Sequence, residues 1–422
     1  MILRTRDIIE QIRQGEIPKG YIRTVSGISP TDWKRYTFGD IYTERKEPGS
    51  EELPLLMVSI HSGVSDGEVD EEELPKKVKR IEDKSQYKKA VSGDLVFNMM
   101  RAWQGAIGTV RTAGMVSPAY IVAKPNDKVY PLFMDYYTRT PQMINQINRQ
   151  SYGVTDFRKR LYWDSFAPIG CTLPPIEEQR KIAAILTTQD RVIELKEKHL
   201  AEKQRQKKYL MQQLLTGKKR LPGFSGEWKN IKLCEVLSER KEKNVEQNLR
   251  ICSVAVQKGV VDQVEHLGRS YAANDTSNYS VAHYGDIIYT KSPTGDFLYG
   301  IVKQNLLQET VAVSPLYGVF TPLTFGLGYF LHTYFQSAIC ARNYLLPIVQ
   351  KGAKNTINIT NDTFISSKLY LPLDVEEQKA IADTFIAADR EIDLLRQDIE
   401  QEKQKKKALM QLLLTGIVRV KT

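Results

Sequence analysis

The chain reads Leu173-Pro174-Pro175-Ile176-Glu177-Glu178-Gln179 at its middle and Leu371-Pro372-Leu373-Asp374-Val375-Glu376-Glu377-Gln378 near its end. The two Glu-Glu-Gln triplets lie 199 residues apart, and their similarity continues without a gap to Leu-Leu-Thr-Gly at 214–217 and 413–416. Self-similarity at a fixed period indicates a duplicated structural unit. The sequence therefore predicts one unit built twice, each consisting of a domain followed by a long helix.

Fainter similarity precedes each helix. Trp33-Lys34 matches Trp228-Lys229, Glu44-Arg45-Lys46-Glu47 matches Glu239-Arg240-Lys241-Glu242, Gly93-Asp94 matches Gly285-Asp286, and Val116-Ser117-Pro118 matches Val313-Ser314-Pro315. Short apolar runs such as Leu95-Val96-Phe97 and Ile287-Ile288-Tyr289 follow Gly-Asp, which is typical of strands bounded by turn residues. Helical pattern recurs at 132–137 and 327–331, so each repeat is expected to begin with an α+β domain.

The helices are expected to pair as an antiparallel coiled coil. Neither Pro nor Gly interrupts residues 177–216, while Pro174-Pro175 precedes and Gly217 follows, as at many helix ends. A seven-residue repeat keeps one stripe facing a partner helix. The predicted seam comprises Leu186, Ile193, Leu200, Lys207, Leu214, Phe385, Ile392, Ile399, Lys406 and Leu413. Two amphipathic helices on separate cores remain an alternative, and the two seam lysines either set register, dock a partner or snorkel to water.

The predicted fold is α+β, with two globular domains separated by two long antiparallel helices and related by a pseudo-twofold internal repeat. The expected segments are 1–25, an N-terminal stretch with a short helix that completes the helical region beside the C-terminal helix; 26–172, the first domain; 173–220, the central helix; 221–371, the second domain; and 372–422, the C-terminal helix.

Composition indicates a polyanionic partner and a cytoplasmic protein. The 422 residues carry 60 Lys and Arg against 50 Asp and Glu, and clustered cations gain affinity by releasing counterions from phosphates. The four cysteines form no Cys-x-x-Cys pair, so we expect buried thiols in a reducing compartment. The five histidines lack metal-ligand spacing, and His199 is expected to be exposed on the helix. No apolar run approaches the ~20 residues of a membrane span.

Catalytic motifs are missing from the sequence. It contains neither a Gly-x-x-x-x-Gly-Lys-Ser/Thr phosphate loop nor the Asn/Asp-Pro-Pro-Tyr/Phe segment of amino-methyltransferases. The Glu44-Arg45-Lys46 and Glu239-Arg240-Lys241 triplets lack the upstream Pro-Asp of a nuclease metal site, and we interpret them as solvated charged turns. No catalytic residue and no metal ligand is therefore expected.

Basic residues interleaved with aromatic and amide side chains remain as candidate DNA contacts. Arg and Lys can bond guanine, Asn and Gln can bond adenine, and the same groups can neutralise phosphates. The candidates in the first domain are Arg101, Trp103, Gln104, Tyr152, Arg158, Lys159 and Arg160. Those at matching places in the second domain are Lys291, Thr294, Gln350, Lys351, Lys354 and Asn355. For each, a solvated surface residue is an equally good interpretation.

These motifs resemble the specificity subunits of type I restriction–modification enzymes over nearly the whole chain. The resemblance rests on the repeated Leu-Pro helix start with Glu-Glu-Gln, on the Leu-Leu-Thr-Gly helix end, and on the Gly-Asp strands. It implies a non-catalytic protein with two target recognition domains, each reading one half of a bipartite asymmetric site in double-stranded DNA. It further implies two modification (methyltransferase) subunits docked on the helices, optional restriction/translocase subunits, and no membrane.

The resemblance places the cofactors outside this chain: S-adenosylmethionine, ATP and Mg²⁺ are expected in the partner subunits. Two other classes of function stay open. One is a coiled-coil structural adaptor without a DNA role, and the other is a stand-alone DNA methyltransferase with an unfamiliar motif order.

Overall fold

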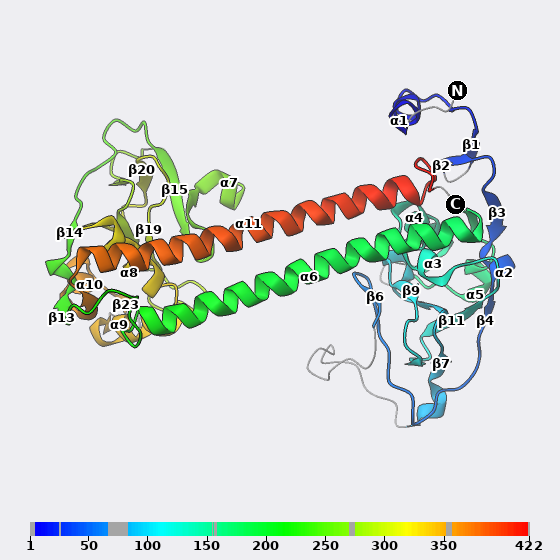
Figure 1. The fold of residues 1–422 in the computed structure, drawn as a ribbon, viewed down its shortest axis with the longest axis horizontal. Helices are drawn as coiled ribbons and strands as arrows, with labels where there is room; N and C mark the ends of the chain where they lie inside the picture. Colours follow the sequence, from blue (N-terminus) through cyan, green and yellow to red (C-terminus); the bar gives the residue numbers. More distant parts are fainter. Residues whose placement is uncertain are drawn as a thin grey trace. The chain divides into compact units, whose positions relative to one another are not determined.

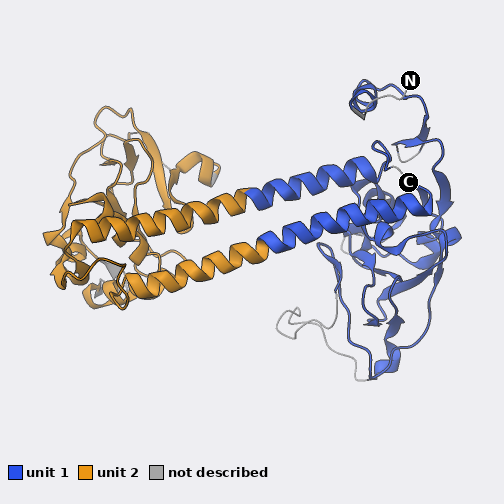
Figure 2. Cartoon of the chain, in the orientation of Figure 1, with its two compact units in different colours: residues 1–196, 398–422 blue, residues 197–397 orange. Residues whose placement is uncertain are grey.

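The computed structural model describes residues 5–24, 27–65, 83–153, 155, 158–269, 275–351 and 357–420. The chain divides into two compact units, which Figure 2 colours separately. Unit 1 comprises residues 1–196 and 398–422, and unit 2 comprises residues 197–397. Each unit holds one mixed domain and part of each long helix, so the division cuts through the helices and does not set them apart as segments of their own.

Unit 1 is built on a four-stranded antiparallel sheet of order β4-β11-β8-β9, of which Figure 1 labels β4, β11 and β9. These strands are Tyr42–Glu44, Tyr120–Pro125, Leu95–Asn98 and Ile107–Thr109. The other strands described in unit 1 form pairs: β1 (Tyr21–Thr24) with β2 (Gly27–Pro30), β3 (Lys34–Thr37) with β12 (Gly170–Leu173), β5 (Val58–Ser59) with β6 (Gly63–Val64), and β7 (Lys88–Ala90) with β10 (Gly114–Val116). The helices are α1 (Thr5–Arg13), α2 (Phe38–Ile41), α3 (Pro131–Tyr137), α4 (Pro141–Gln150) and α5 (Trp163–Phe166).

Unit 2 repeats this sheet in the same order, as β14-β21-β18-β19. The strands are Leu237–Glu239, Gly318–Pro322, Ile287–Tyr289 and Val302–Gln304. A second sheet has the order β16 (Gly259–Asp262), β15 (Arg250–Ala255), β20 (Val311–Val313) and β17 (Ser280–Ala282), and two strand pairs are β13 (Trp228–Lys232) with β24 (Lys368–Pro372) and β22 (Gln350–Lys351) with β23 (Ile357–Asn358). The helices are α7 (Gln263–Leu267), α8 (Phe325–Tyr334), α9 (Ala338–Leu345) and α10 (Asn361–Ser366). The predicted α+β class and internal repeat are confirmed.

The long helices α6 (Ile176–Leu214) and α11 (Val375–Leu413) each contain 39 residues. Both end in the same way, with glycine in the left-handed conformation at Gly217 (φ 69°) and Gly416 (φ 72°). The N–H two residues later turns back to a carbonyl of the last turn, from Lys219 to Gln213 and from Val418 to Leu412. This closure satisfies carbonyls that the helix leaves free, and it needs a residue that tolerates positive φ.

Each domain core includes the start of one long helix and the end of the other. In unit 1, Leu186 near the start of α6 joins Leu413 and Leu414 at the end of α11. In unit 2, Leu214 at the end of α6 joins Ile381 and Phe385 near the start of α11. The helices are therefore antiparallel within each unit. Of the seam positions, Leu200, Lys207 and Lys406 are half-buried and the other seven are buried.

The two seam lysines form equivalent ion pairs between the helices. In unit 2, Lys207 pairs with Asp389, whose carboxylate also accepts a hydrogen bond from Tyr329 Oη (2.9 Å). In unit 1, Lys406 pairs with Asp190, which accepts a hydrogen bond from Tyr136 Oη (2.7 Å). Because an ion pair inside an apolar seam is satisfied in one register only, these lysines favour the role of fixing register over snorkelling.

The second glutamate of each Glu-Glu-Gln triplet is a buried carboxylate that pairs with an arginine. Glu178 is almost fully buried and accepts hydrogen bonds from Arg419 Nε and Nη2, both at 2.8 Å. Its counterpart Glu377 accepts from Arg220 and from Trp228 Nε1 (3.1 Å). The segment that follows one long helix is therefore bound to the first turn of the other helix by an ion pair.

The expectation that the charged turns after β4 and β14 are solvated was wrong for their arginines. Arg45 and Arg240 are not solvated: Arg45 Nε donates to Asp94 (2.7 Å) and Arg240 Nε donates to Asp286 (2.6 Å), and both carboxylates are buried. The aspartates of the repeated Gly-Asp dipeptides therefore connect each sheet to the arginine of the charged turn through a buried ion pair. The expectation of four buried thiols was also wrong, because Cys234 is exposed and Cys340 is half-buried.

The N-terminal segment meets the C-terminal segment in unit 1 through a strand. Tyr21 of β1 donates a hydrogen bond from Oη to the carbonyl of Gly416 (3.0 Å). The expected short helix is present as α1, but this contact comes from Tyr21 and not from α1 packing beside α11. His199 is exposed as expected. Among the described helices, none combines the length and the apolar character that a bilayer span requires.

We predict that Arg220→Ala and Arg419→Ala each lower the stability of their own unit. Removing either arginine leaves a buried glutamate without its cation, which costs about 3 kcal/mol. Calorimetric unfolding would measure the change, with Arg191→Ala as the control, because Arg191 pairs with Glu194 on the exposed helix surface. Equal effects from all three substitutions would contradict a special role for the buried carboxylates.

Candidate nucleic-acid interface

A tight turn after β8 presents the first group of candidates in unit 1. Ala102–Gln104 forms one turn of 3-10 helix that ends at Gly105 with φ 103°. Ala102 is buried and anchors the turn, and Trp103 Nε1 donates to the carbonyl of Met100 (3.0 Å). Arg101 and Gln104 are left exposed at the surface.

A short hairpin between α4 and α5 lies against this turn. Its ends are Tyr152 and Arg160, which exchange both backbone hydrogen bonds (3.2 and 3.0 Å). The next residue, Leu161, donates from its N–H to the carbonyl of Met99 (2.8 Å) and so ties the hairpin to the first turn. The Lys159 ammonium lies 5.4 Å from the centre of the Trp103 ring. The structure thus joins the two predicted segments of unit 1 into one surface.

This surface combines aromatic faces with cations. Tyr152 is 59% exposed and packs against the exposed Tyr162, with ring centres 5.9 Å apart. Arg158 and Arg160 are exposed on the same hairpin. Exposed rings and guanidinium groups can contact bases and phosphates. Lys159 also donates to Asn148 Oδ1 (3.1 Å), which suits a role in positioning Trp103.

The corresponding turn of unit 2 follows β18. Lys291 has a positive φ of 57°, a conformation that costs free energy for a residue with a side chain. The loop is held in place by Phe297, which is buried in the core and exchanges backbone hydrogen bonds with Thr294 (3.0 Å each). Burial lowers the pKa of Lys291, while Thr294 is exposed.

The second group of unit 2 also lies on a hairpin. Gln350 and Lys351 form β22, which pairs with β23 between α9 and α10, at the place that the Tyr152–Arg160 hairpin occupies in unit 1. Lys354 and Asn355 lie outside the described residues. Sequence reasoning missed Tyr162 and Leu298, which are exposed beside the candidate segments; an apolar residue next to a turn was the available signal.

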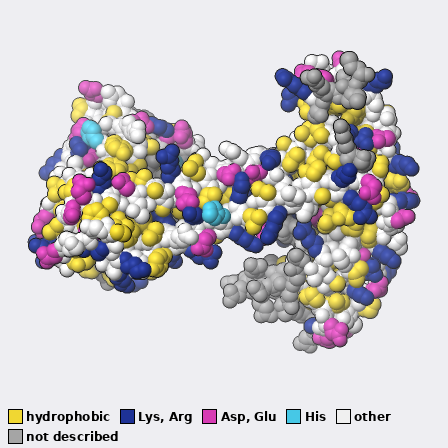
Figure 3. Space-filling model, viewed as in Figure 1, with side chains coloured by type: hydrophobic (Ala, Val, Ile, Leu, Met, Phe, Trp, Pro, Cys, Tyr) yellow, Lys and Arg dark blue, Asp and Glu magenta, His cyan; other side chains and the backbone are white. Residues whose placement is uncertain are grey.

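The visible surface carries charges of both signs. Figure 3 shows Lys and Arg side chains interspersed with Asp and Glu over both units, with apolar side chains between them. Within the described part of the chain, no group of three His, Cys, Asp or Glu side chains is placed to hold a metal ion. The arrangement offers polar and aromatic contact surfaces made by paired turns and hairpins.

Comparison with known proteins identifies related sequences. The family described as "Type I restriction modification DNA specificity domain" matches residues 74–204 and 226–404. The MjaVIII specificity subunit of a type I restriction enzyme from Methanocaldococcus jannaschii is 23% identical and covers 93% of this chain and 94% of that protein. A second relative from the same organism, the putative MjaX specificity subunit, is 48% identical over 64 residues, or 15% of each chain.

Two solved structures share the fold. The type I restriction–modification S subunit from M. genitalium aligns with a TM-score of 0.54 at 10% identity, over 90% of this chain and 96% of that one. A chain from a study of complex assembly and conformational transition of the type I R-M system aligns with a TM-score of 0.50 at 18% identity, over 92% and 99% of the two chains.

We predict that duplex DNA changes the fluorescence of Trp103. This ring is half-exposed within the candidate surface, whereas Trp33 and Trp228 are buried in their cores. Titration with duplex DNA should give a signal that Trp103→Phe removes and Trp33→Phe retains. Trp163, which follows Tyr162, is also half-exposed, so a signal that survives both Trp103→Phe and Trp163→Phe would place the contact elsewhere.

Proposed function

The chain belongs to the type I restriction–modification DNA specificity family and is a specificity subunit, the recognition component of such a system and not its catalyst; we propose that each unit reads one half of a bipartite, asymmetric site in double-stranded DNA. One observation carries this proposal. The two units keep the same sheet order and the same buried ion pairs, while the residues of their surface turns and hairpins differ. A common framework with different contact residues suits two modules that recognise different sequences.

The second part of the proposal concerns the spacing between the two half-sites, which depends on the paired helices. The domains are joined through α6 and α11, and the Lys-Asp pairs favour one register between these helices. We infer that the paired helices set the number of unread base pairs between the two half-sites. Base contacts then determine which sequences are read, and the helices determine how far apart these sequences lie.

The internal repeat also supports a proposal for the number and kind of partner subunits. Leu195 on α6 and Leu394 on α11 occupy equivalent positions and are both exposed, at 49% and 56%. Two equivalent apolar positions on the helices favour two copies of one partner, which we assign as modification (methyltransferase) subunits. Restriction/translocase subunits would join that assembly. S-adenosylmethionine, ATP and Mg²⁺ would bind to these partners, which would supply the chemistry.

Two alternatives predict different experimental results. A coiled-coil adaptor without a DNA role would show no salt-sensitive binding to duplex DNA, even when assembled with its partners. A stand-alone methyltransferase would transfer methyl groups without any other subunit. The family membership and the exposed Arg-rich hairpin favour recognition over both.

We predict that substitutions in one unit affect one half-site only. Arg160→Ala in unit 1 and Lys351→Ala in unit 2 should each relax or weaken recognition of a different half, by about 1–3 kcal/mol if a base contact is lost. Methylome sequencing of cells that carry each variant would measure the change. Arg191→Ala on the exposed helix surface is the control. Loss of discrimination at both halves from one substitution would contradict the modular assignment.

We also predict that Leu195→Asp and Leu394→Asp each remove one copy of the modification subunit from the assembly. A charge placed in an apolar interface costs several kcal/mol, whereas the same charge on an exposed helix position leaves the isolated chain folded. Native mass spectrometry would count the subunits. Seam variants Leu200→Asp and Ile399→Asp are the comparison, and they should lower the melting temperature of the isolated chain. Full assembly of the Leu195→Asp, Leu394→Asp double variant would refute this docking site.

A further inference from the structure

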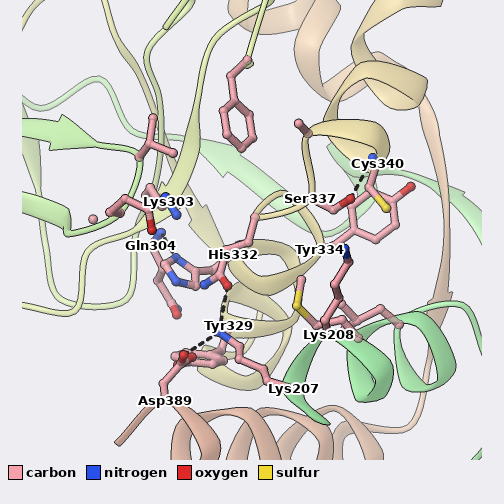
Figure 4. Close-up of a pocket in the computed structure, with 18 of the residues that line it drawn as sticks. Lys207, Lys208, Lys303, Gln304, Tyr329, His332, Tyr334, Ser337, Cys340 and Asp389 are labelled. Atoms are coloured by element: carbon pink, nitrogen blue, oxygen red, sulfur yellow. Dashed lines mark hydrogen bonds and ion pairs between the residues drawn. The ribbon is translucent and has the colours of Figure 1, made fainter. Parts of the chain in front are cut away.

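A cavity of unit 2 is lined by a largely buried lysine, Lys303, that the recognition function does not use. The cavity has a volume of about 1240 Å³ and lies between β19, α8, the start of α9 and the unit 2 parts of α6 and α11. Figure 4 shows Lys303, Gln304 and His332 on one side, Tyr334, Ser337 and Cys340 on the other, and Lys207 with Asp389 below. Every residue that lines it belongs to unit 2.

Lys303 is the central feature of this cavity. Its side chain comes from the edge strand β19, and the residue is only 4% exposed. Among the described residues, none forms a hydrogen bond or an ion pair with the Lys303 ammonium. Burial, together with the nearby charge of Lys207, lowers the pKa of Lys303 to about 8. The Lys303 side chain lines the cavity, and the nearby charge of Asp389 offsets only part of the effect of burial, so an anion in the cavity would stabilise the ammonium.

The surrounding groups leave Lys303 available for a ligand. The carboxylate of Asp389 is engaged by Lys207 and by Tyr329 Oη, and Lys207 also donates to Gln336 Oε1 (2.9 Å). His332 is buried, and its Nδ1 accepts the N–H of Gln304 (3.0 Å). Burial and the neighbouring lysines hold the pKa of His332 well below its usual value, so the ring is neutral and does not compensate the ammonium.

The opposite wall supplies further groups that attract anions. Ser337 caps the eight-residue helix α9, and Ala338 and Ile339 of its first turn line the cavity. Backbone N–H groups at a helix start carry partial positive charge and bind phosphate readily. Lys208 lines the same region, as do the apolar side chains of Phe297 and Ile339.

The first repeat shows that the fold does not require this lysine. The strand pairings β8–β9 and β18–β19 place Gly108 opposite Val96 and Lys303 opposite Ile288, at matching positions of the two sheets. In unit 1, a side chain at Gly108 would meet the β5–β6 hairpin, at 3.1 Å from Val64 N. The same sheet is thus built with glycine at a filled site in one unit and with lysine at a hollow site in the other.

We propose that this cavity binds a small phosphorylated molecule, with a phosphate on Lys303 and with its other end against the opposite wall, at the first turn of α9 and the side chain of Ile339. A small ligand fits better than the backbone of a DNA duplex, because duplex phosphates contact protruding side chains and Lys303 is buried. The ligand would link β19 to the helices within unit 2. The cavity borders the turn after β18, because Thr294 and Phe297 line it, but Lys303 and α9 themselves lie outside the turns and hairpins assigned to DNA.

Calorimetric titration of the full chain with inorganic pyrophosphate, and separately with ADP, tests the proposal. Both should bind the wild type, and Lys303→Met should weaken binding about tenfold or more, as expected for the loss of a charge-assisted hydrogen bond. Lys258→Met is the matched control: Lys258 is exposed at the cavity rim, and its loss should change affinity less than about threefold. Hydrogen exchange should show protection by the ligand at 303–304 and 332–340.

Three outcomes would overturn the assignment. These are no binding of either probe to the wild type, equal losses in the Lys303→Met and Lys258→Met variants, or a loss of duplex DNA binding by Lys303→Met without any binding of the small probes. Ligand-free Lys303→Met should melt at or above the wild-type temperature, because it removes an unpaired buried charge. A lower melting temperature would mean that Lys303 has a structural role, and this result would also contradict the proposal.

Discussion

The fold depends on the return of the chain to its own first domain. Leu413 and Leu414 at the end of α11 enter the core of unit 1, and Arg419 then neutralises Glu178 at the start of α6. Leu214, Leu215, Arg220 and Glu377 repeat this arrangement in unit 2. Neither domain is complete without the end of a helix whose other end belongs to the other unit. Antiparallel helices are therefore a condition of building either core.

Apolar packing alone would leave the register of two long helices weakly specified, because a heptad seam offers similar burial after a shift of one repeat. The buried and half-buried charges remove that freedom. A shift would separate Lys207 from Asp389 and Lys406 from Asp190, and the tyrosines that hydrogen bond to these aspartates belong to α8 and α3 of the domains. Register between the helices and docking of each domain on them are thus fixed by the same carboxylates. The desolvation cost of these charges limits their net stabilisation, so we interpret them as determinants of specificity.

Features with a local physical cause could be predicted from the sequence. The long helices follow from an uninterrupted run between Pro and Gly, the seam from its seven-residue period, and the duplication from aligned residues. The sheet order could not be predicted, because strand pairing joins residues far apart, such as Val122 with Val96 and Glu44 with Ala123. The same limit explains the error at Arg45, whose partner Asp94 is 49 residues away. The candidate contacts of unit 1 were predicted as separate segments, and the structure joins them into one surface through the hydrogen bond from Leu161 to Met99 and the contact of Lys159 with the Trp103 ring.

Differences between the repeats extend from the surface into the interior. The backbone N–H of Thr109 in β9 donates to the carboxylate of Asp135, whereas the N–H of Gln304 in β19 donates to the neutral ring of His332. A buried N–H needs an acceptor, but the acceptors in the two units differ in charge. The neighbouring charged residues differ as well. Arg139 pairs with Asp135 in unit 1, whereas Lys303 of unit 2 lies near Lys207 and Asp389 of the long helices. The part of each long helix within a unit is therefore adapted to its own domain. A recognition module of this protein therefore consists of a domain together with its parts of α6 and α11. If such a module is exchanged between related proteins, these contacts are preserved only when the two chains are joined inside the helices, near residues 196 and 398.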